Sequence, residues 1–150
     1  MSKNSSIFLL NNFLDSCPKG DGYVIILERC YYIEKESLNN TDARINCQNR
    51  NGFAYNGRLF EPRNSTTNHQ VIESAKMITQ STKFWIGIND LGTEGTFQYT
   101  TGGDLVYTNW ANGEPNNTNL DGEDCVETYS DATWNDQHCT DQIPSICEMI

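Results

Sequence analysis

Six cysteines constrain the fold of this 150-residue chain more than any other feature of its sequence. They are scattered along the chain, at Cys17, Cys30, Cys47, Cys125, Cys139 and Cys147. No two of them form a Cys-x-x-Cys pair, which disfavours a zinc ribbon or a thioredoxin-type redox site. An even number of scattered cysteines is typical of a secreted domain held by disulfides. We therefore expect three disulfides and an extracellular protein, with the pairing left open at this point.

The first two cysteines predict a local feature. Cys17 and Cys30 flank an Asp21-Gly22 turn signal and the apolar run Tyr23–Leu27. This pattern predicts a small hairpin closed by a disulfide. No apolar run approaches the roughly 18 residues that a membrane-spanning helix needs, so we expect no membrane span.

Charge divides the chain into two unlike parts. Every Lys and Arg lies at or before Lys83, whereas residues 84–150 hold twelve Asp or Glu and no Lys or Arg. The net charge of −10 disfavours binding to nucleic acid. Two carboxylates about 4 Å apart repel each other by about 4 kcal/mol at an effective dielectric of about 20. The C-terminal part must therefore spread these charges into water or bind cations.

The hydrophobic pattern predicts two helices followed by short strands. One helix is expected over Thr41–Asn49. A second is expected to start at Thr67, which forms a capping box with Gln70, and apolar residues then recur from Val71 with helical spacing. Strands are expected at Arg29–Ile33, Phe84–Ile88, Thr96–Tyr99, Cys125–Tyr129 and Ser145–Glu148. The polar stretch Leu105–Leu120 reads as a long loop, and long loops in compact domains are usually functional.

Oxygen-bearing side chains are concentrated in and after this loop, at Glu114, Asn116, Glu123, Asn135 and Asp136. They offer carboxylate or amide oxygens and no thiolate, which suits a hard cation, and Ca²⁺ takes six to eight such ligands. Three of the five are acidic. The pattern lacks the D-x-D-x-D-G run of an EF-hand. It predicts a calcium site with room for further oxygens from solvent or ligand.

These residues belong to an ordered set of motifs that resembles a C-type lectin carbohydrate-recognition domain. The motifs are Trp85-Ile86-Gly87-Ile88, Asn109-Trp110, Glu114-Pro115-Asn116, Gly122-Glu123-Asp124-Cys125, Trp134-Asn135-Asp136, and the closing Cys139 and Cys147. They occur in the order and at the spacing of that family. The resemblance covers residues 17–150, which leaves residues 1–16 as an N-terminal extension.

The resemblance implies the architecture. It implies an α+β fold with two helices, small antiparallel sheets and a long calcium-binding loop. It also implies the disulfides Cys17–Cys30, Cys47–Cys147 and Cys125–Cys139, and a cis bond between Glu114 and Pro115.

The resemblance also implies site residues. It places the main calcium ion on Glu114, Asn116, Glu123, Asn135 and Asp136, and the sugar on the first four of these. Each Asn would give its carbonyl oxygen to calcium and its NH₂ group to a sugar hydroxyl. An auxiliary calcium site is implied at Asp90, Glu94, Asn117 and Asp124. Glu127 and Asp131 are expected only to add to the negative electrostatic field around the site. The Lys and Arg residues of the first half are expected to be ordinary solvent-exposed charges.

The motif Glu114-Pro115-Asn116 bears on sugar preference. In this family Glu-Pro-Asn accompanies mannose-type sugars, which carry equatorial 3- and 4-hydroxyls, whereas Gln-Pro-Asp accompanies galactose, usually with a Trp under the sugar. Residues 117–122 contain no aromatic residue, which also disfavours a galactose platform. Mannose-type glycans are therefore the expected ligands.

The leading prediction is a secreted, calcium-dependent, mannose-binding lectin of innate immunity. The alternative is an interaction domain of the same fold that binds a protein or a galactose-type glycan. An enzyme is disfavoured, because carboxylates held ionised by calcium make poor general acids. One shallow site binds a single sugar weakly, so we expect homo-oligomers to supply avidity.

Overall fold

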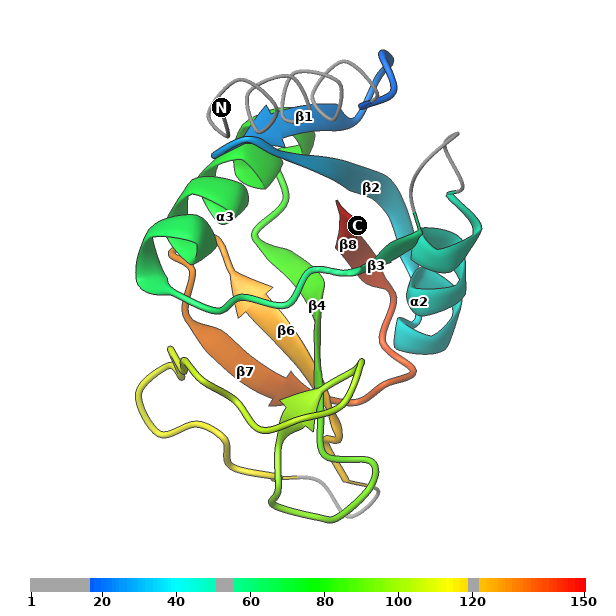
Figure 1. Ribbon diagram of the computed structural model, residues 1–150. Coiled ribbons are helices and arrows are strands. Elements are labelled where there is room, and N and C mark those ends of the chain that lie inside the picture. Colours follow the sequence, from blue (N-terminus) through cyan, green and yellow to red (C-terminus); the bar gives the residue numbers. More distant parts are fainter. Residues whose placement is uncertain (1–16, 51–55, 119–121) are drawn as a thin grey trace, which may run out of the picture.

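The computed structural model describes residues 17–50, 56–118 and 122–150. Within them the elements follow in the order β1 (Tyr23–Ile26), β2 (Arg29–Leu38), α2 (Asn40–Asn49), β3 (Gly57–Leu59), α3 (Ser65–Thr79), β4 (Lys83–Asn89), β5 (Gln98–Tyr99), β6 (Cys125–Tyr129), β7 (Trp134–Gln137) and β8 (Ile143–Met149). Figure 1 shows α2 and α3 at opposite sides of the molecule, with strands between them and long loops at its lower end. No helix in these residues is long and apolar enough to cross a membrane.

The described strands join into one sheet. Its order is β1-β2-β8-β4-β6-β7, with β3 paired to β8 and β5 paired to β4. The pairs are antiparallel except for the contact of β4 with β8. The disulfides join Cys17 to Cys30, Cys47 to Cys147 and Cys125 to Cys139. The described residues thus confirm the predicted α+β fold, with two helices and three disulfides among them.

The two helices test the capping arguments. Helix α2 begins at Asn40 and is capped by Asn39, whose side-chain oxygen accepts a hydrogen bond from the Asp42 N–H at 2.9 Å. The expected start of the second helix at Thr67 is wrong. Helix α3 begins at Ser65, because the Asn64 side chain accepts from the Thr67 N–H at 2.9 Å and caps the helix earlier.

The turn of the N-terminal hairpin does not lie at Asp21-Gly22, where the sequence signal suggests it. Strands β1 and β2 are joined at Leu27 and Glu28, whose φ angles are 47° and 61°. Two positive φ angles match the right-handed twist of a hairpin, although neither residue is a glycine. The Asp21-Gly22 turn instead precedes β1, where a side chain on Gly22 would lie 2.8 Å from the ring of Tyr32.

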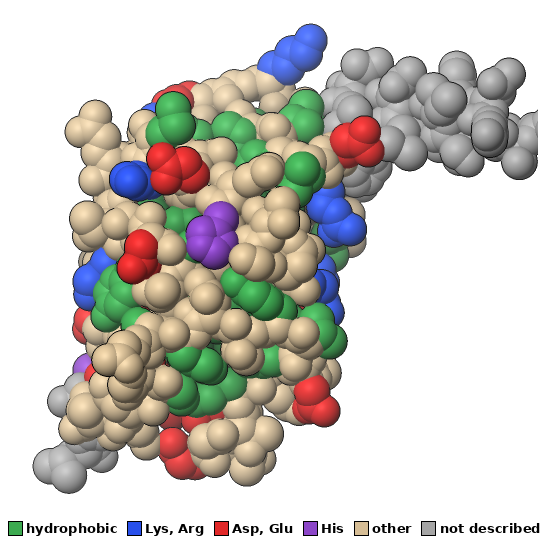
Figure 2. Space-filling view, turned by 90° about the vertical axis from the view of Figure 1, so that its left-hand side faces the viewer, with side chains coloured by type: hydrophobic (Ala, Val, Ile, Leu, Met, Phe, Trp, Pro, Cys, Tyr) green, Lys and Arg blue, Asp and Glu red, His purple; other side chains and the backbone are tan. Residues whose placement is uncertain are grey.

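The uneven charge of the sequence persists in space. On the face shown in Figure 2, Lys and Arg side chains lie in the upper and middle parts and not at the lower end, which carboxylates reach. This lower end carries the loops that follow β4 (Figure 1). The acidic loops therefore project away from most of the basic residues that would neutralise them.

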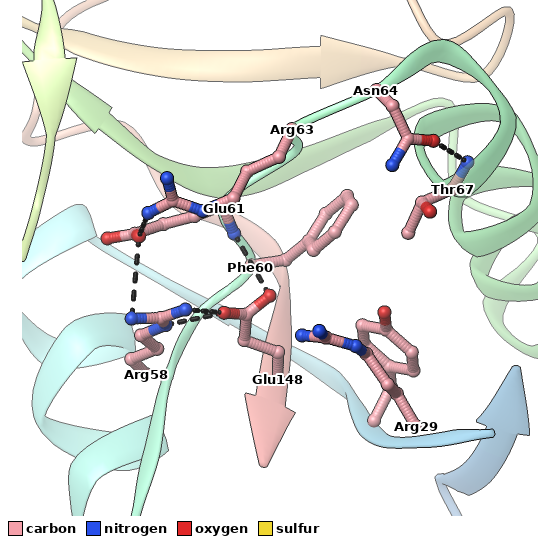
Figure 3. Close-up of a pocket in the computed structure, with 9 residues that line it drawn as sticks. Arg29, Arg58, Phe60, Glu61, Arg63, Asn64, Thr67 and Glu148 are labelled. Atoms are coloured by element: carbon pink, nitrogen blue, oxygen red, sulfur yellow. Dashed lines mark hydrogen bonds and ion pairs between the residues drawn. The ribbon is translucent and has the colours of Figure 1, made fainter. Parts of the chain in front are cut away.

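Two arginines contradict the expectation that basic residues of the first half are merely solvated. The side chains of Glu61 and Glu148 are 0% and 7% exposed. Arg58 forms ion pairs with both, and Arg63 pairs with Glu61 at 2.9 Å, around a cavity of about 110 Å³ (Figure 3). Each of these buried carboxylates thus has a cationic partner.

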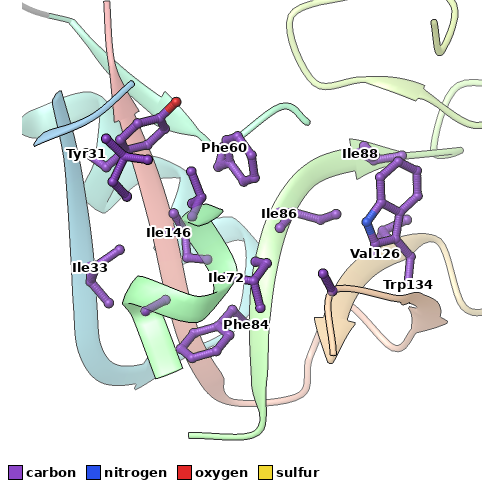
Figure 4. Close-up of a cluster of buried hydrophobic side chains, with 14 of the residues drawn as sticks. Tyr31, Ile33, Phe60, Ile72, Phe84, Ile86, Ile88, Val126, Trp134 and Ile146 are labelled. Carbon is purple, nitrogen blue, oxygen red and sulfur yellow. The ribbon is translucent and has the colours of Figure 1, made fainter. Parts of the chain in front are cut away.

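The main hydrophobic core lies between α3 and the sheet. Ile72 of α3 meets Phe84 and Ile86 of β4, as Figure 4 shows, and all three are fully buried. Trp134 of β7 lies at the far end of the same cluster and is also 0% exposed. Burying a large apolar side chain stabilises a fold by about 1.5–3 kcal/mol. The core therefore holds β7 firmly where its next residues, Asn135 and Asp136, begin the candidate site.

Candidate functional site

The long loop is held against β7 by the backbone of Trp134. The Trp134 N–H donates to the Asn109 carbonyl at 2.9 Å, and the Ala111 N–H donates to the Trp134 carbonyl at 2.8 Å. The Trp110 ring packs edge-on against the Trp134 ring, with centroids 5.7 Å apart. These contacts bring the loop residues after Ala111 to β7.

Asp136 is the centre of the contacts that follow. Its side chain is buried, and its two oxygens accept from the backbone N–H groups of Asn116 at 3.0 Å and Asn117 at 2.7 Å. The Asn116 amide nitrogen donates to Glu114 Oε1 at 2.8 Å. The Glu114–Pro115 bond is cis, as the resemblance implies. The structure thus brings together Glu114, Asn116 and Asp136, which are up to 22 positions apart in the sequence.

Glu123 joins this group and Asn135 faces a different partner. Glu123 is buried, and its Oε2 accepts from the Thr118 N–H at 3.1 Å. The Glu123 charge acts on Glu114, where it helps to raise the pKa. Asn135 is also buried and follows Trp134 on β7, but its NH₂ group donates to Glu127 at 3.1 Å. Contacts among the described residues therefore connect four of the five expected ligands, with Asn135 next to Asp136 in the chain.

The electrostatics of this group fit a bound cation. Burial, followed by the neighbouring Asp136 and Glu123, raises the pKa of Glu114. Glu114 Oε2 is buried without a hydrogen-bond partner in the described part of the chain. No salt bridge between described residues reaches Glu114 or Asp136, unlike the buried Glu61 and its arginines. Acceptor oxygens that no described Lys or Arg pairs with suit a hard divalent ion.

A second acidic group lies in the adjoining loops. Oxygens of Asp90, Glu94 and Asp124 lie within 4.8 Å of one another. Burial raises the pKa of Asp90, with the Glu94 and Asp124 charges adding to the shift. One oxygen of Asp90 accepts from the Gly95 N–H at 2.7 Å, and the other is buried without a partner among the described residues. This group also fits a cation.

Asn117, the fourth expected member of that second group, connects it to the first. Its amide nitrogen donates to Glu94 at 2.7 Å, and its carbonyl oxygen accepts from the Glu123 N–H at 2.8 Å. An amide oxygen has two lone pairs, so this hydrogen bond leaves one of them for a cation.

A family model for the lectin C-type domain matches residues 29–149, which is most of the chain. The chain belongs to the C-type lectin domain family. This agrees with the motifs and with the loop geometry above.

Curated relatives of this lectin domain include collectins. Collectin-10 of Gallus gallus is 35% identical over 150 residues, which cover 98% of this chain and 49% of that protein. Collectin-43 of Bos taurus is 43% identical over 94 residues, which cover 61% of this chain and 29% of that protein. The chain thus spans half or less of the length of these relatives.

Solved structures of similar shape support the fold of the lectin domain. The cow CD23 carbohydrate-recognition domain is 27% identical, with a TM-score of 0.74, and the match covers 87% of this chain and 95% of that one. CEL-I of Cucumaria echinata is 23% identical, with a TM-score of 0.79, and the match covers 88% of this chain and 97% of that one. At that lower identity the likeness shows the fold alone.

The contacts of Glu127 and Lys83 in this lectin domain differ from what the sequence led us to expect. Glu127 was expected only to add negative field, but its side chain is 0% exposed and bonds to both Asn135 and Lys83. The signal in the sequence was the strand Cys125–Tyr129 followed closely by Trp134-Asn135-Asp136. An antiparallel pairing across the turn between them places Glu127 opposite Asn135.

Proposed function

We propose that this lectin domain binds sugars through a calcium ion held by Glu114, Asn116, Glu123, Asn135 and Asp136. The observation that carries the proposal is the group of acceptor oxygens around Asp136, where neither Glu114 nor Asp136 forms a salt bridge with another described residue. A bound calcium ion supplies coordination positions for two vicinal hydroxyl oxygens of a sugar. The collectin relatives support this kind of lectin.

The side chains of the site have complementary roles toward a sugar. A carboxylate such as Glu114 or Glu123 gives one oxygen to the cation and leaves the other to accept a hydroxyl proton. The Asn116 amide gives its oxygen to the cation and its NH₂ group to a hydroxyl. In the structure that NH₂ group donates to Glu114, so donor and acceptor lie side by side.

Mannose-type sugars are the proposed ligands. The motif Glu114-Pro115-Asn116 and the lack of aromatic residues over 117–122 support this preference. The cow CD23 domain was solved in the presence of a GlcNAc2Man3 oligosaccharide, which contains mannose. A similar structure is that of a calcium-independent type II antifreeze protein, so the fold alone does not decide the ligand. The alternative ligands are a galactose-type glycan or a protein.

We assign Asp90, Glu94, Asn117 and Asp124 to an auxiliary calcium site. The second acidic group supports this, because three of these four residues converge within 4.8 Å. Asn117 ties this group to the Asp136 group through its backbone and side chain. An ion there would relieve repulsion that otherwise pushes the two loops apart.

The proposal extends to the setting of the domain. Three disulfides and the collectin relatives support an extracellular protein of innate immunity, with residues 17–150 as the sugar-binding domain and residues 1–16 as an extension. Binding explains the site better than catalysis, since its carboxylates serve the ion. A single sugar at such an open site is expected to bind at about millimolar Kd, about −4 kcal/mol, so homo-oligomers would add avidity.

Competition binding tests the sugar preference. The domain should bind a mannose-coated surface in calcium, release it in EDTA, and be eluted by mannose more readily than by galactose. The double change Glu114→Gln with Asn116→Asp should weaken mannose binding, because it moves a charge and an amide between two positions in contact. Retention on mannose after exhaustive chelation would defeat the calcium proposal. Elution by galactose and not by mannose would defeat the specificity alone.

Acidification should weaken calcium binding, and the effect should begin at a pH above the range in which carboxylates usually titrate. Burial and neighbouring carboxylates raise the pKa values of Glu114 and Asp90, so protons compete with calcium there at a higher pH than at ordinary carboxylates. Binding must release these protons, and affinity should therefore rise with pH and fall on acidification. Calorimetric calcium titrations in buffers of different ionisation enthalpy count the protons released. An affinity unchanged between neutral and mildly acidic pH, with no proton release, would contradict this.

A further inference from the structure

A buried carboxylate that no expected role explains lies behind the candidate site. Glu127 of β6 is directly opposite Asn135 of β7 in the strand register, and its side chain is 0% exposed. Its Oε1 accepts from Asn135 Nδ2 at 3.1 Å and from Lys83 Nζ at 3.1 Å. Its Oε2 is buried without a partner among the described residues. Burying an ionised carboxylate is costly unless it is well paired, and the Lys83 side chain is itself 39% exposed.

The charge of Glu127 decides which way the Asn135 amide points. An amide group keeps its shape when it is turned over, so packing alone does not distinguish its oxygen from its nitrogen. An ionised carboxylate only accepts hydrogen bonds. The orientation with the Asn135 oxygen toward Glu127 would set two acceptors against each other. The NH₂ group therefore faces Glu127, and no described hydrogen bond reaches the Asn135 carbonyl oxygen.

We infer that Glu127 is a positioning residue that turns the Asn135 amide so that its carbonyl oxygen is presented to the calcium ion. The inference rests on the proposed function, in which Asn135 is a ligand. Glu127 itself does not touch the ion or the sugar in this assignment. Lys83 contributes by donating to Glu127 Oε1, the same oxygen that accepts from the Asn135 NH₂ group.

The change Glu127→Leu is diagnostic because it nearly preserves size and removes the acceptor that orients Asn135. Glu127→Gln would not remove it, because Lys83 donates to the same oxygen and would keep the oxygen of a new amide toward the Asn135 NH₂ group. With Leu at position 127, neither orientation of the Asn135 amide is favoured. Partners that orient metal ligands typically contribute 10–100-fold in affinity. We therefore expect Glu127→Leu to weaken calcium binding of the full chain by about 10–100-fold, measured by calorimetry with calcium alone.

A matched control separates orientation from stability. Glu148→Leu removes another buried, cation-paired carboxylate, on β8, whose partner is Arg58. It should leave calcium affinity within about twofold, because Glu148 contacts none of the proposed ligands. Equal weakening by both changes would show that lost stability is responsible and would overturn the inference.

A double change supplies the rescue. Glu127→Leu is combined with Asn135→Asp, which places a carboxylate at position 135. That carboxylate has an oxygen at either end, so one oxygen faces the ion whichever way it is turned. The double variant should recover most of the affinity that Glu127→Leu loses. Failure of this rescue in a folded protein would overturn the inference.

A measurement on the unmodified protein keeps the inference falsifiable if the variants do not fold. Nuclear magnetic resonance of the ion-free protein should show the Asn135 side-chain NH₂ protons protected from solvent exchange, as a bond to a buried carboxylate requires. Freely exchanging protons would overturn the orientation by Glu127. If wild-type protein binds no calcium while these protons are protected, the proposed function fails and the orientation stands as a structural feature only.

Discussion

Asp136→Asn is expected to lower calcium affinity by at least about 100-fold and to abolish sugar binding. The change removes one of the site's three negative charges. It also replaces an acceptor by a donor opposite one of two backbone N–H groups, those of Asn116 and Asn117, which Asp136 holds at 3.0 and 2.7 Å. The loss should exceed the roughly 10–100-fold that outer partners of metal ligands contribute.

The control for this prediction removes a charge of the same kind elsewhere. Asp104→Asn changes an exposed carboxylate of the same acidic half, whose hydrogen-bond partner is Gln98. It should leave calcium affinity nearly unchanged, because long-range charge is screened at physiological ionic strength. Calcium titration by calorimetry and binding to a mannose surface check both variants. Comparable affinities for Asp136→Asn and Asp104→Asn would remove Asp136 from the site.

Loss of the Cys47–Cys147 disulfide is expected to destabilise the domain by about 4–5 kcal/mol. This bond joins α2 to β8 and closes a separation of 100 residues. A loop of that length loses chain entropy worth about 4.7 kcal/mol in the unfolded state when it is closed. Domain stabilities are about 5–15 kcal/mol in total. The double change Cys47→Ala with Cys147→Ala should therefore leave the domain marginally folded or unfolded.

The N-terminal disulfide provides the comparison. Cys17 and Cys30 are separated by only 13 residues, and a loop of about that length contributes about 3 kcal/mol in the same model. Urea denaturation of both double Ala variants should show the larger loss of unfolding free energy for the Cys47–Cys147 pair. A larger loss for the Cys17–Cys30 pair would contradict the loop-length argument.

The sequence predicted helices and strands well where local signals were strong. Cys125–Tyr129 is found as predicted, and the helix expected over Thr41–Asn49 differs by one residue. The prediction from sequence failed where two local signals competed for the same helix start. Asn64 and Thr67 both favour helix starts, and the earlier one is used. The short strand Gly57–Leu59 was not predicted, because it exists through pairing with β8.

The sequence by itself determined which chemistry this domain can offer. Acidic and amide residues in a segment without Lys or Arg predict a cation site from residue type alone. The cysteines predict a disulfide-bonded fold. Which oxygens are free for an ion was decided only by the tertiary structure. Asp136 is used by backbone groups 19 and 20 positions away, and Asn135 is turned by Glu127 across the strand pair. The reason is physical: a side chain's composition is local, but its burial, its partners and its orientation depend on what other segments bring beside it.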